Sequence, residues 1–365
     1  MRLRCEKEKL LKALAKVSNI VSDKTTMPIL SYLLMETKGN KLRLMATDLK
    51  AGVETFLEVK VEEEGAIACP AKKFQGVVRE LPSGEMAIDT QKNNSILINA
   101  GTNHIRLMGL GTEDFPRLPE IKKGVKIAID GRELKEIIKE TYFAVSYDEN
   151  RFILNSLYFK IGEGVLKVAA TDGRRMAYLC RKVEVSTDTP VEAIIPINAI
   201  KEIEQLIDET LPASIIFSEN QVVFSSGDTR FISRLVEGQF PDYEKIIPKT
   251  LKWKVGLNRE EFLAAIRRMA LLTSERTNAV KMDLGKKKLV VSIINPELGE
   301  GREEIKCEGE TEAASVSFNP NYLLDFLKNN TSETVDFQFN DVLSPGVFKP
   351  TSQDNYLYFL MPIKI

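Results

Sequence analysis

Residues 33–56 read LLMETKGNKLRLMATDLKAGVETF, and residues 157–180 read LYFKIGEGVLKVAATDGRRMAYLC. In both segments an apolar run, a glycine-containing turn and a second apolar run lead to Ala-Thr-Asp, which ends at Asp48 and, 124 residues later, at Asp172. The dipeptide Phe115-Pro116 recurs 125 residues later, and a third, weaker copy begins near Leu257. Self-similarity at a long, fixed spacing is typical of folds built from repeated units. Three tandem copies of one unit are therefore expected.

Each copy is predicted to begin with an amphipathic helix. Leu10, Leu14 and Val17 lie on one helical stripe, and equivalent stripes start at Leu134 and Phe262. Short apolar strands with glycine turns follow. A second helix is expected to begin near a proline, which suits a first helical turn, at three equivalent places: Pro70, Pro196 and Asn319. The order helix, strands, helix, strands predicts an α+β unit with helices on one face of antiparallel sheet.

Two further signals mark the boundaries of the units. Asp130 and Asn258 stand where helix N-caps belong. The segments Glu113–Gly124 and Glu237–Lys249 contain prolines and are typical of linkers. We therefore predict three domains, at 1–120, 121–247 and 248–365.

The composition is that of an ordinary globular protein. The chain has 365 residues, 43% of them hydrophobic and 28% charged, and a net charge of −1. No apolar run approaches the roughly 18–20 residues that span a bilayer, and no signal peptide is apparent, so a cytoplasmic protein is expected. The net charge excludes a uniformly basic nucleic-acid binder, but it allows basic and acidic faces to be segregated.

The sequence lacks the familiar motifs of catalysis. It has no phosphate-binding loop, no GxGxxG, no HExxH and no GxSxG, and His104 is its single histidine. We therefore predict no catalytic residue, no metal site and no cofactor. Asp48 and Asp172 could form a pair of catalytic carboxylates. The other interpretation is that each Ala-Thr-Asp closes a turn in which the side chains satisfy backbone groups.

Five strings, in the same order and at the same spacing, resemble the bacterial sliding clamps, the β subunits of DNA polymerase III: MPIL at 27–30, RFILN at 151–155, ATDGRRMA at 170–177, FPDY at 240–243 and MPIKI at 361–365. The resemblance implies three clamp domains per chain and a head-to-tail homodimer that forms a ring of six units. It also implies a processivity factor without chemistry of its own. As a subunit of the polymerase holoenzyme, the chain would be classified with the DNA-directed DNA polymerases, which are nucleotidyltransferases.

The resemblance implies a groove in which partner proteins dock a short hydrophobic peptide. Arg174 and Lys245 differ from the residues most frequent in the family, which affects the preferred peptide. The groove residues implied are Arg151, Phe152, Leu154, Thr171, Gly173, Arg174, Arg175, Met176, Pro241, Lys245, Ile246, Asn319, Tyr322, Ser344, Leu360, Met361, Pro362 and Lys364.

Duplex DNA would pass through the ring without being read base by base. The lining is expected to be basic, because phosphates are equivalent at every step along the duplex. The candidate DNA-facing residues are Lys12, Lys16, Lys24, Lys72, Lys73, Arg79, Lys135, Lys139, Lys201, Arg267 and Arg268. The candidate dimer contacts are Ile105 and Leu107 against Leu271 and Leu272.

The expected partners are duplex DNA, a second copy of the chain, the replicative polymerase, a clamp-loader ATPase, and repair polymerases, ligase or mismatch-repair proteins. Two alternatives remain open from the residues alone. One is a metal-dependent enzyme that uses Asp48 and Asp172 on phosphodiesters. The other is a repeat scaffold that binds proteins only.

Overall fold

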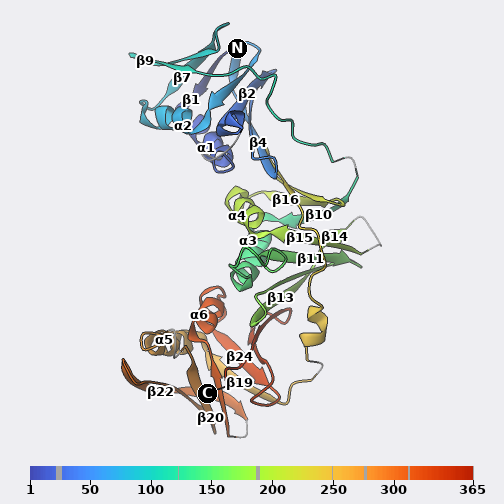
Figure 1. Ribbon diagram of the computed structural model, residues 1–365, viewed down its shortest axis with the longest axis vertical. Helices are drawn as coiled ribbons and strands as arrows, with labels where there is room; N and C mark the ends of the chain where they lie inside the picture. Colours follow the sequence, from blue (N-terminus) through green and yellow to red (C-terminus); the bar gives the residue numbers. More distant parts are fainter. Residues whose placement is uncertain are drawn as a thin grey trace. The chain divides into compact units, whose positions relative to one another are not determined.

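The computed structural model describes residues 1–21, 27–121, 123–185, 190–248, 250–274, 278–310 and 313–364 (Figure 1). The described chain divides into two compact units. The first contains Met1–Lys135, Asn198–Leu235 and strand β14 (Glu184–Val185). The second contains Glu136–Val183, residues 190–197 and residues 236–364. Each unit is described by itself.

The same order of elements occurs three times along the chain. The first copy contains a 3₁₀ turn at Pro28–Ser31 and the elements β1 (Arg2–Glu6), α1 (Lys7–Ser18), β2 (Tyr32–Lys38), β3 (Lys41–Thr47), β4 (Ala51–Glu58), β5 (Lys60–Glu63), β6 (Ala66–Pro70), α2 (Ala71–Glu80), β7 (Glu85–Thr90), β8 (Ser95–Ala100) and β9 (Asn103–Met108).

The second copy repeats this order, with a 3₁₀ turn at Tyr142–Ala144. Besides β14, its elements are β10 (Val125–Asp130), α3 (Gly131–Thr141), β11 (Ser156–Gly162), β12 (Val165–Thr171), β13 (Arg175–Lys182), β15 (Val191–Pro196), α4 (Ile197–Leu206), β16 (Pro212–Phe217), β17 (Gln221–Ser226) and β18 (Thr229–Arg234).

The third copy follows a 3₁₀ turn at Tyr243–Ile246. Its elements are β19 (Trp253–Asn258), α5 (Arg259–Ala270), β20 (Val280–Gly285), β21 (Lys288–Asn295), β22 (Gly299–Glu310), β23 (Ala314–Phe318), α6 (Pro320–Lys328), β24 (Thr334–Phe339), β25 (Gly346–Pro350) and β26 (Tyr356–Leu360). The predicted alternation of helices and strands is confirmed in all three copies, but each copy begins with a strand (β1, β10 or β19) and not with its first helix.

In the first unit, α1 packs beside α2 and against β3 and β4 (Figure 1). Leu10, Leu14 and Val17 are fully buried, which confirms the predicted stripe. The strands form two antiparallel sheets, in the orders β5-β1-β7-β8-β9 and β14-β10-β16-β17-β18-β4-β3-β2-β6. Burial of one face of each helix against sheet supplies the main stabilisation of such a unit.

In the second unit, α5 packs beside α6, and one twelve-stranded sheet runs β15-β11-β12-β13-β26-β25-β24-β19-β22-β21-β20-β23. Its core is rich in phenylalanine. Phe337 stacks on Phe348 with the ring centroids 4.7 Å apart, and Phe326 lies 6.0 Å from Phe348. Such offset aromatic pairs add to the stabilisation from burial.

The helix starts agree with the sequence in part. Asp130 Oδ1 accepts the amide of Arg132 at 2.9 Å, and Asn258 Oδ1 accepts that of Glu261 at 3.1 Å, so both predicted N-caps are confirmed. The predicted starts of the second helices are also confirmed, because α2, α4 and α6 begin directly after Pro70, Pro196 and Asn319. Pro70 and Pro196 are the last residues of β6 and β15, one position before the helix, and Pro320 lies in the first helical turn.

Strand pairing joins successive copies at two junctions. Within the first unit, β4 of the first copy pairs with β18 of the second, and Val53 lies opposite Phe231. Within the second unit, β13 of the second copy pairs with β26 of the third, and Met176 lies opposite Phe359. The same two strand positions of the repeat are thus used at both junctions.

Candidate partner-binding groove

The two Ala-Thr-Asp motifs form the same turn. Thr171 Oγ donates to the carbonyl of Arg175 at 2.6 Å and accepts the amide of Gly173 at 3.0 Å, while Asp172 Oδ1 accepts the amides of Arg174 and Arg175. Residues 47–51 make the same four hydrogen bonds. This confirms the interpretation of the motifs as turns, in which the carboxylates satisfy backbone donors.

The third copy has the equivalent turn without the Ala-Thr-Asp motif. The register of the β20–β21 hairpin, compared with that of β2–β3, makes Asn295 the equivalent of Asp48. Asn295 Oδ1 accepts the amides of Glu297 at 3.0 Å and Leu298 at 3.3 Å. The side-chain oxygen of asparagine accepts backbone amides as a carboxylate does. The turn is therefore the same although the Ala-Thr-Asp motif is absent.

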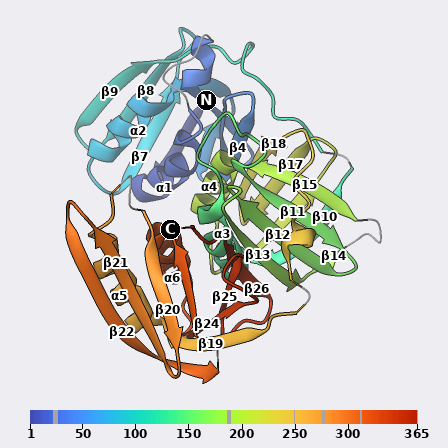
Figure 2. The same cartoon turned by 60° about the horizontal axis from the view of Figure 1, so that its bottom comes forward.

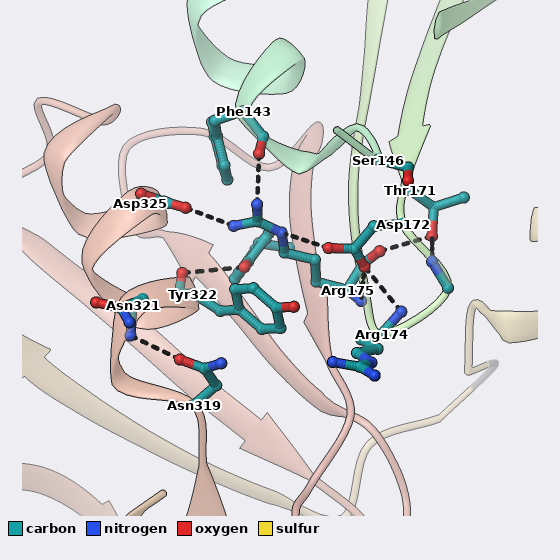
Figure 3. A network of polar contacts seen from close by, with 12 residues as sticks. Phe143, Ser146, Thr171, Asp172, Arg174, Arg175, Asn319, Asn321, Tyr322 and Asp325 are labelled. Atoms are coloured by element: carbon teal, nitrogen blue, oxygen red, sulfur yellow. Dashed lines mark hydrogen bonds and ion pairs between the residues drawn. The ribbon is translucent and has the colours of Figure 1, made fainter. Parts of the chain in front are cut away.

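Arg175 is the centre of the polar network shown in Figure 3. Its side chain is 4% exposed. Nε donates to Asp172 Oδ2 at 3.1 Å, Nη1 to Asp325 Oδ2 at 2.6 Å, and Nη2 to the carbonyl of Phe143 at 2.7 Å. The guanidinium also lies over the ring of Tyr322, 4.2 Å from its centroid. A buried guanidinium with this many partners is well satisfied.

The electrostatic surroundings keep Arg175 charged. Burial by itself lowers the pKa of the guanidinium, but the neighbouring Tyr358 hydroxyl and the hydrogen bond that the guanidinium donates to Asp325 outweigh it. The pKa of Arg175 therefore lies above its ordinary value. The charge is held inside the protein by two carboxylates, one next to it in the turn and one on α6.

Beside this network lies a small, mostly apolar cleft of about 60 Å³. The structure brings eight of the predicted groove residues together there: Thr171, Gly173, Arg174, Arg175, Met176, Ile246, Leu360 and Met361. Two further lining residues, Phe359 and Pro345, were missed by the sequence analysis. Phe359 could have been found from its place in the C-terminal strand, next to Leu360.

Other predicted groove residues lie near the turn. Arg151 Nη1 donates to the carbonyl of Asp172 at 3.1 Å. Asn319 caps α6 through the amide of Asn321, and the Lys245 ammonium pairs with Asp242 at 2.9 Å. Several more predicted residues are exposed or half-buried and contribute no lining atom to the cleft: Phe152, Leu154, Pro241, Ser344, Pro362 and Lys364.

The predicted lining cations fall into two groups. Seven are exposed: Lys12, Lys72, Lys73, Arg79, Lys139, Lys201 and Arg267. Three contact other parts of the chain, and of these Arg268 is exposed as well. The Lys16 ammonium donates to Thr229 at 3.0 Å, Lys135 pairs with Glu209 at 2.6 Å, and Arg268 pairs with Glu303. Lys24 lies outside the described residues.

The predicted dimer contacts are placed on two surfaces. Ile105 and Leu107 are half-buried residues of β9, which is the edge strand of its sheet (Figure 2). Leu271, at the end of α5, is 80% exposed, and Leu272 is half-buried.

In the part of the chain that the structure describes, no cluster of three or more His, Cys, Asp or Glu side chains could hold a metal ion. Asp48 and Asp172 are occupied by backbone amides and by Arg175. The geometry therefore defines a protein of repeated α+β units with an apolar cleft beside a buried cation.

Comparison with known proteins identifies the family. Models of the N-terminal, central and C-terminal domains of the DNA polymerase III beta subunit match residues 1–119, 128–242 and 244–364. A beta sliding clamp of Halalkalibacterium halodurans is 33% identical over 364 residues, with 95% of each chain covered. The chain belongs to the β sliding-clamp family of DNA polymerase III subunits.

Solved structures agree with this assignment. The sliding clamp of Bacillus subtilis has a TM-score of 0.95 and 29% identity, over 100% of this chain and 99% of that one. A sliding clamp of Pseudomonas aeruginosa bound to griselimycin has a TM-score of 0.96 and 28% identity, over 100% of both chains. The chain is thus a processivity factor without catalytic activity, and the family implies DNA and a polymerase as partners.

Among the described residues, no helix is long and apolar enough to cross a membrane.

Proposed function

We propose that two copies of this chain close head to tail into a ring around duplex DNA, in the cytoplasm, with domain boundaries near residues 120 and 247. The strand pairing at the two junctions carries this proposal. In the repeat, β4, β13 and β22 are equivalent, and so are β9, β18 and β26. The pairs β4·β18 and β13·β26 are made within the chain, which leaves β22 and β9 to pair between copies.

Both remaining strands have a free edge. Among the residues that the structure describes, β9 pairs with β8 alone, and residues 299–306 of β22 pair with β21 alone (Figure 2). A free edge presents unpaired backbone donors and acceptors to another strand. A head-to-tail contact of this kind forms a closed ring when its rotation closes.

The register of the first junction predicts which residues meet. Gly52 lies opposite Ile232 and Val53 opposite Phe231. Transferred to the free edges, this register places Glu300 opposite Arg106 of the second copy, and Gly301 opposite Ile105 of the second copy. The space that a side chain at Gly301 would need is filled by Met269 and Leu272, so an apolar surface would face Ile105.

A charge exchange tests this closure. Arg106→Glu and Glu300→Arg should each weaken the dimer, roughly tenfold, because each places like charges opposite one another. The double variant restores the attraction and should restore the dimer. Sedimentation equilibrium measures this, because it distinguishes the monomer mass of 41.1 kDa from twice that value. Additive weakening in the double variant would contradict the proposed register.

A ring holds DNA by topology. Contacts to bases would add about 1–3 kcal/mol of roughness for each good pair and would impede sliding, whereas phosphates are equivalent at every step. The seven exposed cations named above are the proposed DNA-facing residues. On nicked circular DNA the loaded protein should be retained during gel filtration and lost after the circle is cut. Retention that does not depend on cutting would refute the ring.

We also propose that the cleft beside Arg175 receives short hydrophobic peptides of the polymerase, the clamp-loader ATPase, repair polymerases, ligase or mismatch-repair proteins. Its apolar lining with a few polar groups suits such a ligand. The griselimycin complex of the Pseudomonas aeruginosa clamp is consistent with a ligand site on this fold. Deleting residues 361–365 should abolish polymerase stimulation and leave the dimer intact. If stimulation survives, the groove is wrongly placed.

A further inference from the structure

A second cleft, in the first unit, lies where the first and second copies join. It has a volume of about 360 Å³ and is lined by the linker 116–119, by residues of β17 and β18, and by the turn residues Thr47, Leu49, Lys50 and Ala51. Backbone contacts join the turn to strand β18, which form two of its walls. The amide of Arg234 donates to the carbonyl of Lys50 at 3.0 Å, and Ser233 pairs with Ala51 across β18 and β4. This volume is within the roughly 300–1,000 Å³ of ordinary ligand pockets.

The charge of this cleft distinguishes it from the other two cavities described in the first unit. Three cations line it, Lys50, Arg117 and Arg234, and no carboxylate does. The cavity beside β1 has three cations and three glutamates, and the cavity on the other side of the linker has two cations and two glutamates. In a chain with a net charge of −1, this local excess is an attractive site for an anion.

The three cations are available. All three are exposed, and none has an ion pair among the described residues. Between them lies an apolar floor that includes Leu49, Leu118 and Ile232. A ligand that fits must therefore combine negative charge with an aliphatic group.

We propose that this cleft binds an acidic protein segment that carries aliphatic side chains. Its carboxylates would pair with Lys50, Arg117 and Arg234, and a leucine-like side chain would lie on the floor. A single-stranded nucleic acid is the less suitable ligand, because none of the lining residues is aromatic and bases could not stack there. This site lies in the first unit and is additional to the groove beside Arg175.

The experiment uses the full-length protein and a fluorescent peptide of alternating aspartate and leucine. We expect binding by fluorescence anisotropy at about 0.05 M salt and its loss at about 0.5 M salt, because exposed charges are screened. The double variant Lys50→Glu, Arg234→Glu should weaken binding by about tenfold or more. Lys38→Glu, at an exposed position away from the cleft, is the matched control and should bind as the parent does.

Two further measurements separate this site from the others. Ile246→Asp places a carboxylate in the groove of the second unit and should leave binding of the acidic peptide unchanged. An oligothymidylate should not displace the peptide. The proposal is overturned if Ile246→Asp removes binding, if Lys38→Glu weakens it as much as the double variant, or if only the oligonucleotide binds.

Discussion

Residues 47–52 and 171–176 form the same turn at the end of the same strand, yet they support different surfaces. All four hydrogen bonds of the turn are repeated. The side chains differ at four positions. The first copy has Leu49, Lys50, Ala51 and Gly52, where the second has Gly173, Arg174, Arg175 and Met176. The backbone conformation of the turn is the same in both copies, so the chemical difference between the two surfaces comes from a few side chains.

At the first junction the small residues let the linker approach. A side chain at Gly52 would collide with Leu118, so the glycine leaves the space that this leucine occupies. At the second junction Met176 is buried with Phe240 and Tyr243 of the next linker, and Arg175 occupies the interior. The first junction thus presents exposed cations around an apolar floor, and the second an apolar cleft beside an enclosed cation.

The largest difference between the junctions should appear when Arg175 is removed. Arg175→Ala leaves Asp172 and Asp325 without their partner and opens the wall of the groove. We expect the free energy of unfolding to fall by roughly 3–5 kcal/mol, the usual cost of breaking a buried ion pair on one side. Urea unfolding measures it, with exposed Arg174→Ala as the matched control. Equal effects of the two variants would show that Arg175 contributes no special stabilisation.

Asp325→Asn should have an intermediate effect. The amide keeps the size of the side chain and removes the charge that Arg175 Nη1 contacts at 2.6 Å, while Asp172 still pairs with Nε. We expect a loss of about 1–2 kcal/mol and severalfold weaker binding of a groove peptide, measured by denaturation and calorimetry.

Asp354 provides the comparison for Asp325. Its side chain is 95% exposed in its pair with Lys349, and Asp354→Asn should change stability by less than about 0.5 kcal/mol. If Asp325→Asn lowers the stability but leaves the peptide affinity at the parent value, the contact from α6 only stabilises the fold and does not position Arg175 for binding.

Much of the fold could be predicted from the sequence, because repetition supplies the same signal three times. The helical stripes, the two N-caps and the hairpins depend on residues close together in the chain, where periodicity and capping rules apply. Tyr322, which is next to the buried Leu323 on α6, lies half-buried under Arg175 instead of in the core. A planar cation can satisfy an aromatic face as well as apolar packing does, and the sequence pattern does not separate the two.

The contacts that could not be predicted from the sequence join residues that are far apart along the chain. Arg175 and Asp325 lie 150 positions apart, and Lys16 and Thr229 lie 213 apart. No local pattern indicates such pairs, so neither Asp325 as a partner of Arg175 nor the contact between Lys16 and Thr229 could be predicted. The turn at Asn295 gives no Ala-Thr-Asp signal in the sequence, because asparagine replaces the aspartate of the other copies. Tertiary contacts decide these cases.

Gly173→Ala tests the backbone of the second turn. Gly173 has φ +88°, a conformation that costs other residues about 1–2 kcal/mol, and the added Cβ would lie 3.3 Å from Arg151 Nη2. We expect a loss of that size in urea unfolding. Gly76→Ala is the matched control in a helix, where it should stabilise by roughly 0.5–1 kcal/mol. Stabilisation by both substitutions would contradict the role assigned to φ.

The smallest effect is expected at the equivalent position of the first turn, with the opposite sign. Leu49 has φ +73°, so Leu49→Gly removes backbone strain of about 1–2 kcal/mol and adds the unfolded-state entropy of glycine, about 0.5–1 kcal/mol. The net result should be a stabilisation of less than about 1 kcal/mol by thermal unfolding, with weaker binding of the acidic peptide because the floor of its cleft loses a side chain. Clear destabilisation would mean that the packing of this half-exposed leucine stabilises the protein by more than its backbone strain costs. Leu49 would then contribute to stability and not to peptide binding.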